Sequence, residues 1–131
     1  MTYIDSDILI DILKGEKTII KKFEILATKD LSIKTTTINS FELFKGAYKS
    51  QKKEQNLILV NELLKNLDIK EFTFGASKTA AKIFSEISSK GEIIDIADQM
   101  IASIVISDND ILITRNKRHF ERILGLKLEV W

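Results

Sequence analysis

Short strand-like segments alternate with helix-like segments along the whole chain, and this alternation restricts the fold more than any other feature. The strand candidates are brief runs of apolar and β-branched residues, and the helix candidates carry apolar residues at steps of three and four. Parallel strands need a long crossover connection, which is usually a helix. We therefore predict an α/β fold with a central, mainly parallel sheet of about four or five strands and helices on both faces.

The expected elements follow one another without a linker, a repeat or a low-complexity segment. The strand candidates are residues 1–4, 31–36, 68–72, 111–114 and 126–131. The helix candidates are residues 7–13, 17–27, 37–50, 52–67, 73–89, 95–106 and 116–124. A chain of 131 residues is long enough to bury one core. We therefore expect a single domain over residues 1–131.

Composition excludes several classes of site. The chain has no Cys, which rules out disulfides, Cys-ligated zinc and thiol chemistry, and its single His rules out a multi-His metal site. Lys and Arg total 20 against 19 Asp and Glu, so the net charge does not indicate a nucleic-acid partner. No apolar run approaches the roughly 18 residues of a membrane span, and no charged leader precedes an apolar run. We expect a cytoplasmic protein that does not enter a membrane.

Residues 91–116 tie an acidic helix start to a strand end through one tight polar turn. Asp95 and Asp98 open the helix candidate, and Asn116 follows the strand candidate at 111–114. Carboxylates are favoured at helix N-termini, where backbone N–H groups lack partners. An N-cap role explains Asp95 as well as a role in a site does. It explains Asp98 less well, because two further acidic residues of the chain have the same kind of setting.

Those two residues are Asp5, which closes the first strand candidate, and Glu42, which lies in the first turns of the helix after the second. In a parallel sheet, strand ends and the helix starts that follow them gather at one edge. Three unpaired carboxylates in one cleft would repel each other, and a bound divalent cation resolves that conflict. Ligands that are all oxygen select Mg²⁺ or Mn²⁺. Taken singly, each carboxylate also has a bland explanation as a turn or solvated helix residue.

Four segments, in this order, resemble the PIN domain and, within it, the VapC-type toxin ribonucleases: YIDSDILIDIL, INSFELFKGA, DIADQMIASIV and ILITRNKRHF. Each motif is short, and the ordered set over Thr2 to Val130 carries the resemblance. It implies a three-layer α/β/α sandwich. It also implies a metal-dependent endoribonuclease, the toxin of a VapBC-type toxin–antitoxin pair, in which metal-activated water hydrolyses RNA phosphodiester bonds.

The resemblance also implies roles for particular residues. The acidic site of the family falls on Asp5, Glu42, Asp98 and Asn116. The three carboxylates would hold Mg²⁺ or Mn²⁺, and the neutral Asn116 would orient a water or a carboxylate. Ser6 and Thr114 match supporting polar positions of the family. Asp95, three residues before Asp98 on the same helix face, could bind the metal through water.

The resemblance further implies a homodimer and a small VapB-type antitoxin whose tail blocks the site. Basic residues near the expected mouth could hold the RNA backbone without reading bases: Lys45, Lys49, Arg115 and Lys117. We assign the stripe of Phe41, Phe44 and Tyr48 to the core in preference to a subunit interface.

Three other positions have competing explanations. We interpret Asp7 as the N-cap of the first helix. Gly46, one turn after Glu42, either leaves room for substrate or allows close helix packing. We interpret His119 as structural, or as a minor phosphate contact, in preference to a catalytic base.

Two other functions compete with the ribonuclease. Residues 4–7, IDSD, resemble the nucleophile motif of haloacid-dehalogenase-like phosphotransferases, although that family needs a longer chain with a Lys and a later Asp pair. A non-catalytic domain that only binds RNA or a partner is the other alternative. The presence of Asp5, Glu42 and Asp98 together argues against it.

Overall fold

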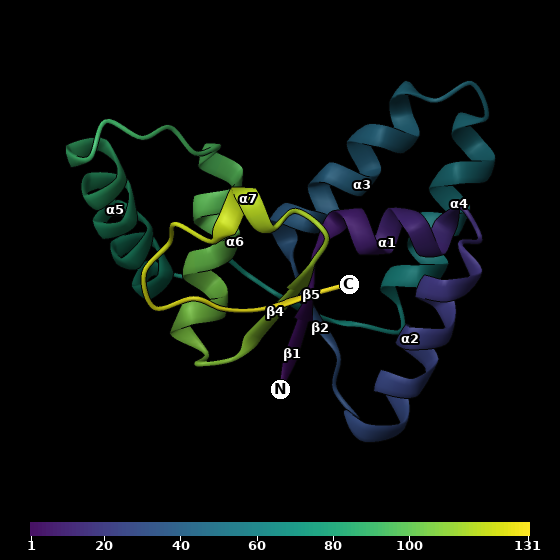
Figure 1. The fold of residues 1–131 in the computed structure, drawn as a ribbon. Helices are drawn as coiled ribbons and strands as arrows, with labels where there is room; N and C mark the ends of the chain where they lie inside the picture. The colour runs from purple at the N-terminus through teal and green to yellow at the C-terminus, as the bar shows by residue number, and fades with distance from the viewer.

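A computed structural model, which describes residues 1–131, has a five-stranded sheet between two groups of helices (Figure 1). The strands are β1 (Thr2–Ile4), β2 (Lys34–Thr36), β3 (Asp68–Lys70), β4 (Ile111–Thr114) and β5 (Lys127–Val130). The helices are α1 (Ser6–Leu13), α2 (Lys17–Lys29), α3 (Thr37–Lys49), α4 (Lys53–Leu64), α5 (Phe74–Ser89), α6 (Ile96–Ser107) and α7 (Lys117–Phe120). None of these helices has both the length and the apolar character needed to cross a bilayer.

All the strand pairings are parallel, and the strand order is β3-β2-β1-β4-β5. The first strand of the chain therefore lies at the centre of the sheet, between β2 and β4. In the β1–β4 register, Ile4 lies opposite Ile113. The predicted α/β fold, with its parallel sheet and helices on both faces, is confirmed.

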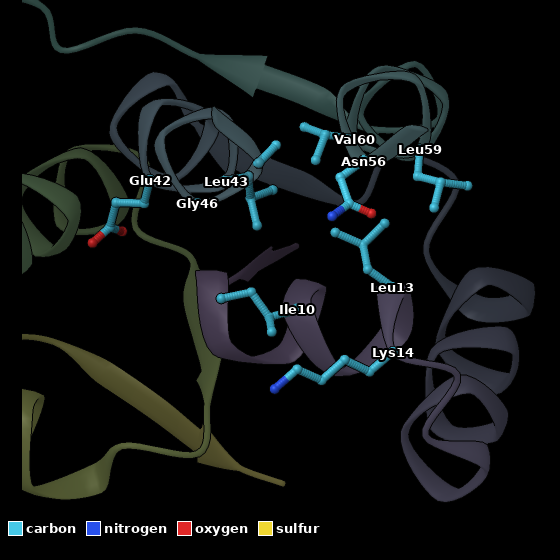
Figure 2. Close-up of a pocket in the computed structure, with 10 residues that line it drawn as sticks. Ile10, Leu13, Lys14, Glu42, Leu43, Gly46, Asn56, Leu59 and Val60 are labelled. Atoms are coloured by element: carbon cyan, nitrogen blue, oxygen red, sulfur yellow. The ribbon is translucent and has the colours of Figure 1, made fainter. Parts of the chain in front are cut away.

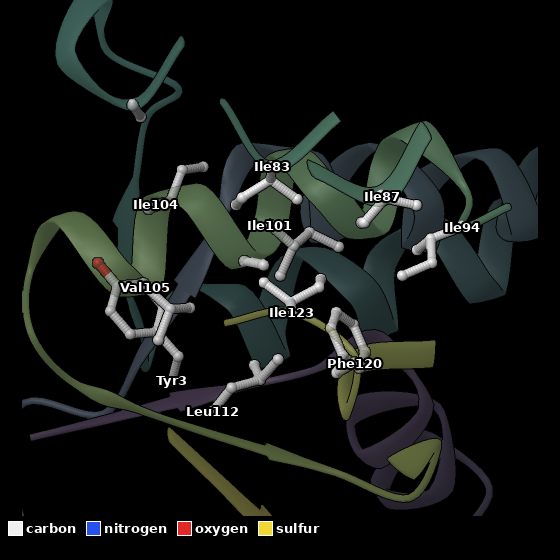
Figure 3. Close-up of a cluster of buried hydrophobic side chains, with 12 residues drawn as sticks. Tyr3, Ile83, Ile87, Ile94, Ile101, Ile104, Val105, Leu112, Phe120 and Ile123 are labelled. Atoms are coloured by element: carbon white, nitrogen blue, oxygen red, sulfur yellow. The ribbon is translucent and has the colours of Figure 1, made fainter. Parts of the chain in front are cut away.

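Alternating side chains of β1 and β4 supply the two halves of the core. Tyr3 and Leu112 point to one face and pack with the buried side chains of α5, α6 and α7, as Figure 3 shows. The next residue of each strand, Ile4 and Ile113, packs on the other face with α1, α2, α3 and α4. This is the two-residue period of a strand that is covered on both sides. The two layers of helices hold the central strands, and with them the strand ends, in place.

Several predicted elements are shorter in the structure: the helix predicted over residues 52–67 spans Lys53–Leu64, and the strand predicted over residues 68–72 spans Asp68–Lys70. The strand predicted over residues 31–36 begins only at Lys34, because Leu31 is 99% exposed and the Ser32 N–H donates to Asp30 Oδ1 in a turn. The helix predicted over residues 116–124 ends at Phe120. The chain then turns through Gly125, whose φ of +84° lies in the region that favours glycine.

The carboxyl ends of β1, β2 and β4 meet at one edge of the sheet, where α1 and α3 begin and α6 starts nearby (Figure 1). Asp5 follows β1, and Thr36 ends β2 and caps α3. Thr114 ends β4. Polar side chains from distant parts of the sequence are thus brought to one place, as the sheet rule for parallel strands predicts.

Candidate active site

Asp5 lies at the centre of this edge and is only 5% exposed. Its Oδ1 accepts hydrogen bonds from the Ser6 backbone N–H (2.8 Å) and from Asn39 Nδ2 (3.1 Å). Its Oδ2 accepts a hydrogen bond from Thr114 Oγ1 (2.7 Å). A buried carboxylate is costly unless it is hydrogen-bonded. Three donors from α1, α3 and β4 meet that requirement and fix the orientation of the group.

The pKa of Asp5 is raised to about 7, first by burial and then by the negative charge of Asp7. The hydrogen bonds from Thr114 and Ser6 act in the opposite direction, and the charge of Asp98 adds to the rise. A carboxyl whose pKa is raised by desolvation and by neighbouring charge is typical of functional sites. Asp5 is therefore poised to lose its proton when a positive charge arrives.

Glu42 is connected to Asp5 through Ser6. Ser6 Oγ donates a hydrogen bond of 2.7 Å to Glu42 Oε1, and the same oxygen accepts one of 2.8 Å from Asn39 Nδ2. Glu42 is half-buried on α3. The structure thus joins two predicted carboxylates, with the predicted supporting residue Ser6 between them.

Asp98 occupies the first turn of α6, and its side chain is 14% exposed. Its Oδ2 lies 2.9 Å from His119 Nδ1. The pKa of Asp98 is raised to about 6: burial raises it most, His119 opposes the rise, and the charges of Asp95 and Glu42 add to it. Asp98 therefore shares its electrostatic environment with Glu42. The contact agrees with a structural role for His119.

Asp95 is the N-cap of α6, and its Oδ1 accepts a hydrogen bond from the Ala97 N–H at 2.8 Å. The capping explanation is therefore confirmed for Asp95. Its exposed carboxylate also contributes to the raised pKa of Asp98. Asp98 has no capping contact and is turned to His119 instead. The interpretation from the sequence, that a cap explains Asp95 better than it explains Asp98, agrees with these contacts.

Thr114, the last residue of β4, and Asn116 complete this edge of the sheet. Thr114 is fully buried, donates to Asp5, and accepts a hydrogen bond from the Asn116 backbone N–H at 3.0 Å. The side-chain amide of Asn116 is exposed and makes no hydrogen bond within the chain. Thr114 has the predicted supporting position, and the orienting role of Asn116 stays a prediction.

The assignment of Asp7 as the N-cap of α1 is wrong. Asp5 is the cap, and Asp7 lies one residue inside the helix. Asp7 Oδ2 instead accepts the Arg115 backbone N–H (2.9 Å) and lies 3.3 Å from Thr114 Oγ1. The earlier cap leaves Asp7 free to tie α1 to the end of β4, beside Asp5.

Asn39 is a site residue that the sequence did not reveal. It is completely buried and contacts both Asp5 and Ser6. It lies three residues before Glu42 on α3, so the helical period places both on neighbouring positions of one face. That spacing was the available signal, but a polar residue just after a strand is ordinarily explained as a cap.

A pocket of about 290 Å³ adjoins Glu42 and is bounded by α1, α3 and α4. Figure 2 shows Glu42 at one end, with its carboxylate directed away from the rest of the lining, which is mainly apolar but includes Lys14 and Asn56. Gly46 lines the same pocket, and a Cβ added there would meet nothing within 4 Å. Close helix packing is therefore not the reason for a glycine at this position.

The predicted aromatic stripe on α3 does not belong to the core as a whole. Phe41 and Tyr48 are each 63% exposed, and only Phe44 is packed against the buried cluster. The core assignment is therefore wrong for Phe41 and Tyr48. The buried positions of α3 are Asn39, Leu43 and Ala47. Their four-residue steps define an inner face that excludes the two exposed aromatics.

The residues predicted to contact RNA differ in whether their charge is already paired within the chain. The Arg115 guanidinium is paired with Asp11 of α1, so it is not free. Lys45 and Lys49 are exposed on the side of α3 that carries Glu42 and Gly46, and Lys45 Nζ lies 5.6 Å from the centre of the Phe41 ring. Lys117 is exposed at the start of α7.

The chemistry of the donor set fits a hard divalent cation. The candidate donors are all oxygen, and the pKa values of Asp5 and Asp98 are raised partly by neighbouring carboxylates, a crowding of charge that a cation would relieve. No three acidic or His side chains are close enough in this structure to surround a single ion. An ion held by one or two carboxylates, with water completing its shell, suits such an arrangement.

Comparison with known proteins identifies relatives over the full length. Residues 2–125 match the family model of the PIN domain. The "tRNA(fMet)-specific endonuclease VapC" of Shigella flexneri is 30% identical over 128 residues, which cover 98% of this chain and 96% of the relative. "Ribonuclease VapC2" of Rickettsia felis is 38% identical over 108 residues, which cover 82% of this chain and 80% of the relative.

Solved structures give the same result. A chain in the crystal structure of VapBC2 from Rickettsia felis, bound to a DNA fragment from its promoter, superposes with a TM-score of 0.92 and 34% identity, covering 100% of this chain and 99% of that one. A chain of DNA-bound VapBC from Salmonella typhimurium has a TM-score of 0.90 and 30% identity, covering 99% and 97%. The fold and its similarity to these toxin–antitoxin proteins favour the first of the three functions considered from the sequence.

The raised pKa of Asp5 predicts how stability depends on pH in chelator. The pKa rises from 3.8 to about 7 on folding, so the favourable contribution of the protonated group is complete below pH 3.8 and is lost as pH rises through about 7. Asp5→Asn should therefore be more stable than the unchanged protein at pH 8, with a gain that shrinks towards pH 4. Thermal unfolding in EDTA across this range measures the difference.

Asp95→Asn is the control, because Asn caps a helix about as well as Asp and should change stability little. A loss of stability in Asp5→Asn that is equal at pH 4 and pH 8 would contradict the prediction. Such a result would mean that the charge of Asp5 carries no cost in the folded chain.

Proposed function

This chain belongs to the PIN domain family, and we propose that it is a Mg²⁺- or Mn²⁺-dependent endoribonuclease, the toxin of a VapBC-type toxin–antitoxin pair. The observation that carries the proposal is the buried Asp5 at the end of the central strand, which is joined to Glu42 through Ser6 and whose pKa is also raised by the charge of Asp98. Relatives that bear ribonuclease or endonuclease names align with almost the whole chain, which supports the same activity here.

The residues that would hold the ion are Asp5, Glu42 and Asp98, directly or through water. Asp95 is suited only to a contact through water, because it is exposed and already caps α6. When bound, the cation supplies activation of water for attack on phosphorus and compensation of the charge that develops there. No other group in the chain needs to act as a nucleophile.

The protein's own part in the reaction is to hold these carboxylates still. Thr114 and the Ser6 backbone donate to Asp5, while the Ser6 hydroxyl donates to Glu42. His119 holds Asp98 from the side of α7. Groups that are fixed before substrate arrives do not have to be reorganised in the transition state. Asn116, whose amide is exposed at this edge, is suited to orient a water or a phosphate oxygen.

Three variants test this assignment. Asp98→Asn removes a charge but keeps the shape, and we expect it to reduce RNA cleavage roughly 100-fold or more, the scale of a lost transition-state contact. Asp95→Asn should have a much smaller effect, because it retains the cap. His119→Ala should retain substantial cleavage. The measurement is the cleavage rate of total RNA with mapped sites, in Mg²⁺ and in EDTA.

Folding of each variant is checked by thermal unfolding. Loss of turnover in His119→Ala, combined with retained turnover in Asp98→Asn, would contradict the carboxylate mechanism and point to histidine chemistry. Equal cleavage in Mg²⁺ and in EDTA would contradict the metal requirement.

For RNA binding, the basic residues beside Glu42 are better placed than Arg115. Lys45 and Lys49 continue the Glu42 side of α3, and Lys117 follows Asn116 at the start of α7. Arg115 is engaged by Asp11 and would have to break that pair to reach a phosphate. We assign the RNA backbone a path over α3 and the start of α7. Such contacts position a strand without selecting its sequence.

The salt dependence of RNA binding tests this path. For single strands the slope of log binding constant against log salt changes by about 0.7 for each phosphate contact, so Lys45→Gln with Lys49→Gln should reduce it by about 1.4. Binding is measured in EDTA, so that the strand stays intact.

The chain offers a matched control in Lys78 and Lys82 on α5. These lysines have the same spacing, and Lys78 also lies over a Phe ring, that of Phe74 at 4.8 Å. Lys78→Gln with Lys82→Gln should leave the slope unchanged. Equal slopes for the two double variants would show that the RNA backbone does not preferentially contact α3.

As partners we propose a second copy of the chain and a small VapB-type antitoxin. Solved complexes of similar proteins support the antitoxin, and the exposed Phe41 and Tyr48 suit an interface. An apolar antitoxin segment in the pocket between α1, α3 and α4 would end at Glu42 and cover the carboxylates.

Leu59→Asp, at a half-exposed lining position, should weaken antitoxin binding and leave RNA cleavage intact. Unchanged antitoxin affinity would exclude this pocket.

A further inference from the structure

Asn39 is completely buried, and its side chain uses its full hydrogen-bonding capacity. Its Oδ1 accepts from the Thr36 N–H (3.3 Å) and from Thr36 Oγ1 (2.7 Å). Its Nδ2 donates to Asp5 Oδ1 (3.1 Å) and to Ser6 Oγ (2.8 Å). The backbone N–H of Thr36 can only donate, which fixes the amide oxygen towards Thr36 and the amide nitrogen towards the site.

The Ser6 hydroxyl is oriented by this contact. Because Ser6 Oγ accepts a hydrogen bond from Asn39, its single proton is directed to Glu42 Oε1, 2.7 Å away. The direction of the Ser6 hydroxyl therefore depends on the Asn39 amide. One amide group acts on Glu42 through one intervening hydroxyl.

Asp5 is oriented by the same amide. A carboxylate offers about four acceptor directions, and Asp5 uses three of them for Ser6 N, Asn39 Nδ2 and Thr114 Oγ1. Without the Asn39 donor, Oδ1 would keep only the contact with its own chain neighbour. Thr114 would then be the only side chain that holds the carboxyl group.

We propose that Asn39 is a positioning residue that links Asp5 and Glu42 into one fixed unit, so that both carboxylates face the substrate together. It contacts neither substrate nor ion and acts through the two acidic side chains. The inference rests on the proposed nuclease function of these carboxylates. Groups that orient metal ligands in this way typically contribute 10- to 100-fold to metal affinity or activity.

Asn39 also caps α3, and the two roles use different atoms. The cap is a reciprocal pair in which Asn39 Oδ1 accepts from Thr36 and Thr36 Oγ1 accepts from the Asn39 N–H (3.1 Å). The contacts with Asp5 and Ser6 use only Nδ2. A variant of Thr36 can therefore weaken the cap while leaving the amide donors intact.

The experiment compares Asn39→Leu with Thr36→Val. Each removes the hydrogen bond between Thr36 Oγ1 and Asn39 Oδ1, but only Asn39→Leu removes the donors to Asp5 and Ser6. The readouts are Mn²⁺ affinity by calorimetry, kcat and KM for RNA cleavage, and thermal unfolding. Asn39→Ala replaces Asn39→Leu if the leucine variant does not fold.

We expect Asn39→Leu to lose about 10- to 100-fold in Mn²⁺ affinity and in kcat, with KM little changed. Thr36→Val should unfold at a lower temperature and keep both values within about two-fold. Equal losses of Mn²⁺ affinity in the two variants, measured where both are folded, would overturn the positioning role and leave only the cap. If the protein without substitutions neither binds Mn²⁺ nor cleaves RNA, the proposed function is overturned, and the positioning role with it.

Discussion

The hydrogen bonds that hold the buried carboxylate of Asp5 are the interactions on which the candidate site depends. A carboxylate that is 5% exposed would be unfavourable without donors, and its donors come from elements far apart in the sequence. Asn39 reaches it from α3, and Thr114 reaches it from the end of β4. The contacts are possible only because β1 lies between β2 and β4 in the sheet. The order of the strands therefore determines which side chains can reach Asp5.

The hydrophobic core gives this edge its rigidity. Consecutive residues of β1, Tyr3 and Ile4, are buried on opposite faces, and Leu112 and Ile113 of β4 repeat the pattern. Helices cover both faces, so the central strands cannot shift without disturbing two packed layers. Asp5 follows β1 directly and Thr114 is the last residue of β4, so the packed strands fix the positions of both. The charge that the site concentrates is thus held in place by apolar packing.

The fold and the main carboxylates were predictable from the sequence because they depend on short-range patterns. Alternation of strands and helices indicated a parallel sheet, and the positions of Asp5, Glu42 and Asp98 at strand ends or helix starts indicated their convergence. The order of the motifs carried the family resemblance, and the resemblance supplied the kind of reaction. None of these inferences needed the direction of a particular side chain.

The features that could not be predicted from the sequence depend on the directions of particular side chains. Asp7 and Asp5 are both good caps, and only the start of α1 decides between them. Phe41 and Tyr48 fit a helical stripe, yet Asn39, Leu43 and Ala47 define the inner face of α3. The pair between Arg115 and Asp11 joins residues that are distant in sequence and whose charges alone suggest many partners. Asn39 was missed because its short-range role as a cap conceals its contact with Asp5.

The most direct test of the central claim, that the acidic edge of the sheet binds a divalent cation, is a crystal of the chain soaked in Mn²⁺. Diffraction data at the manganese absorption edge locate the ion without reference to activity. The account predicts an anomalous peak between Asp5 and Asp98, with Glu42 in contact directly or through water. An ordered peak at another carboxylate cluster, with none beside Asp5 at millimolar Mn²⁺, would contradict it.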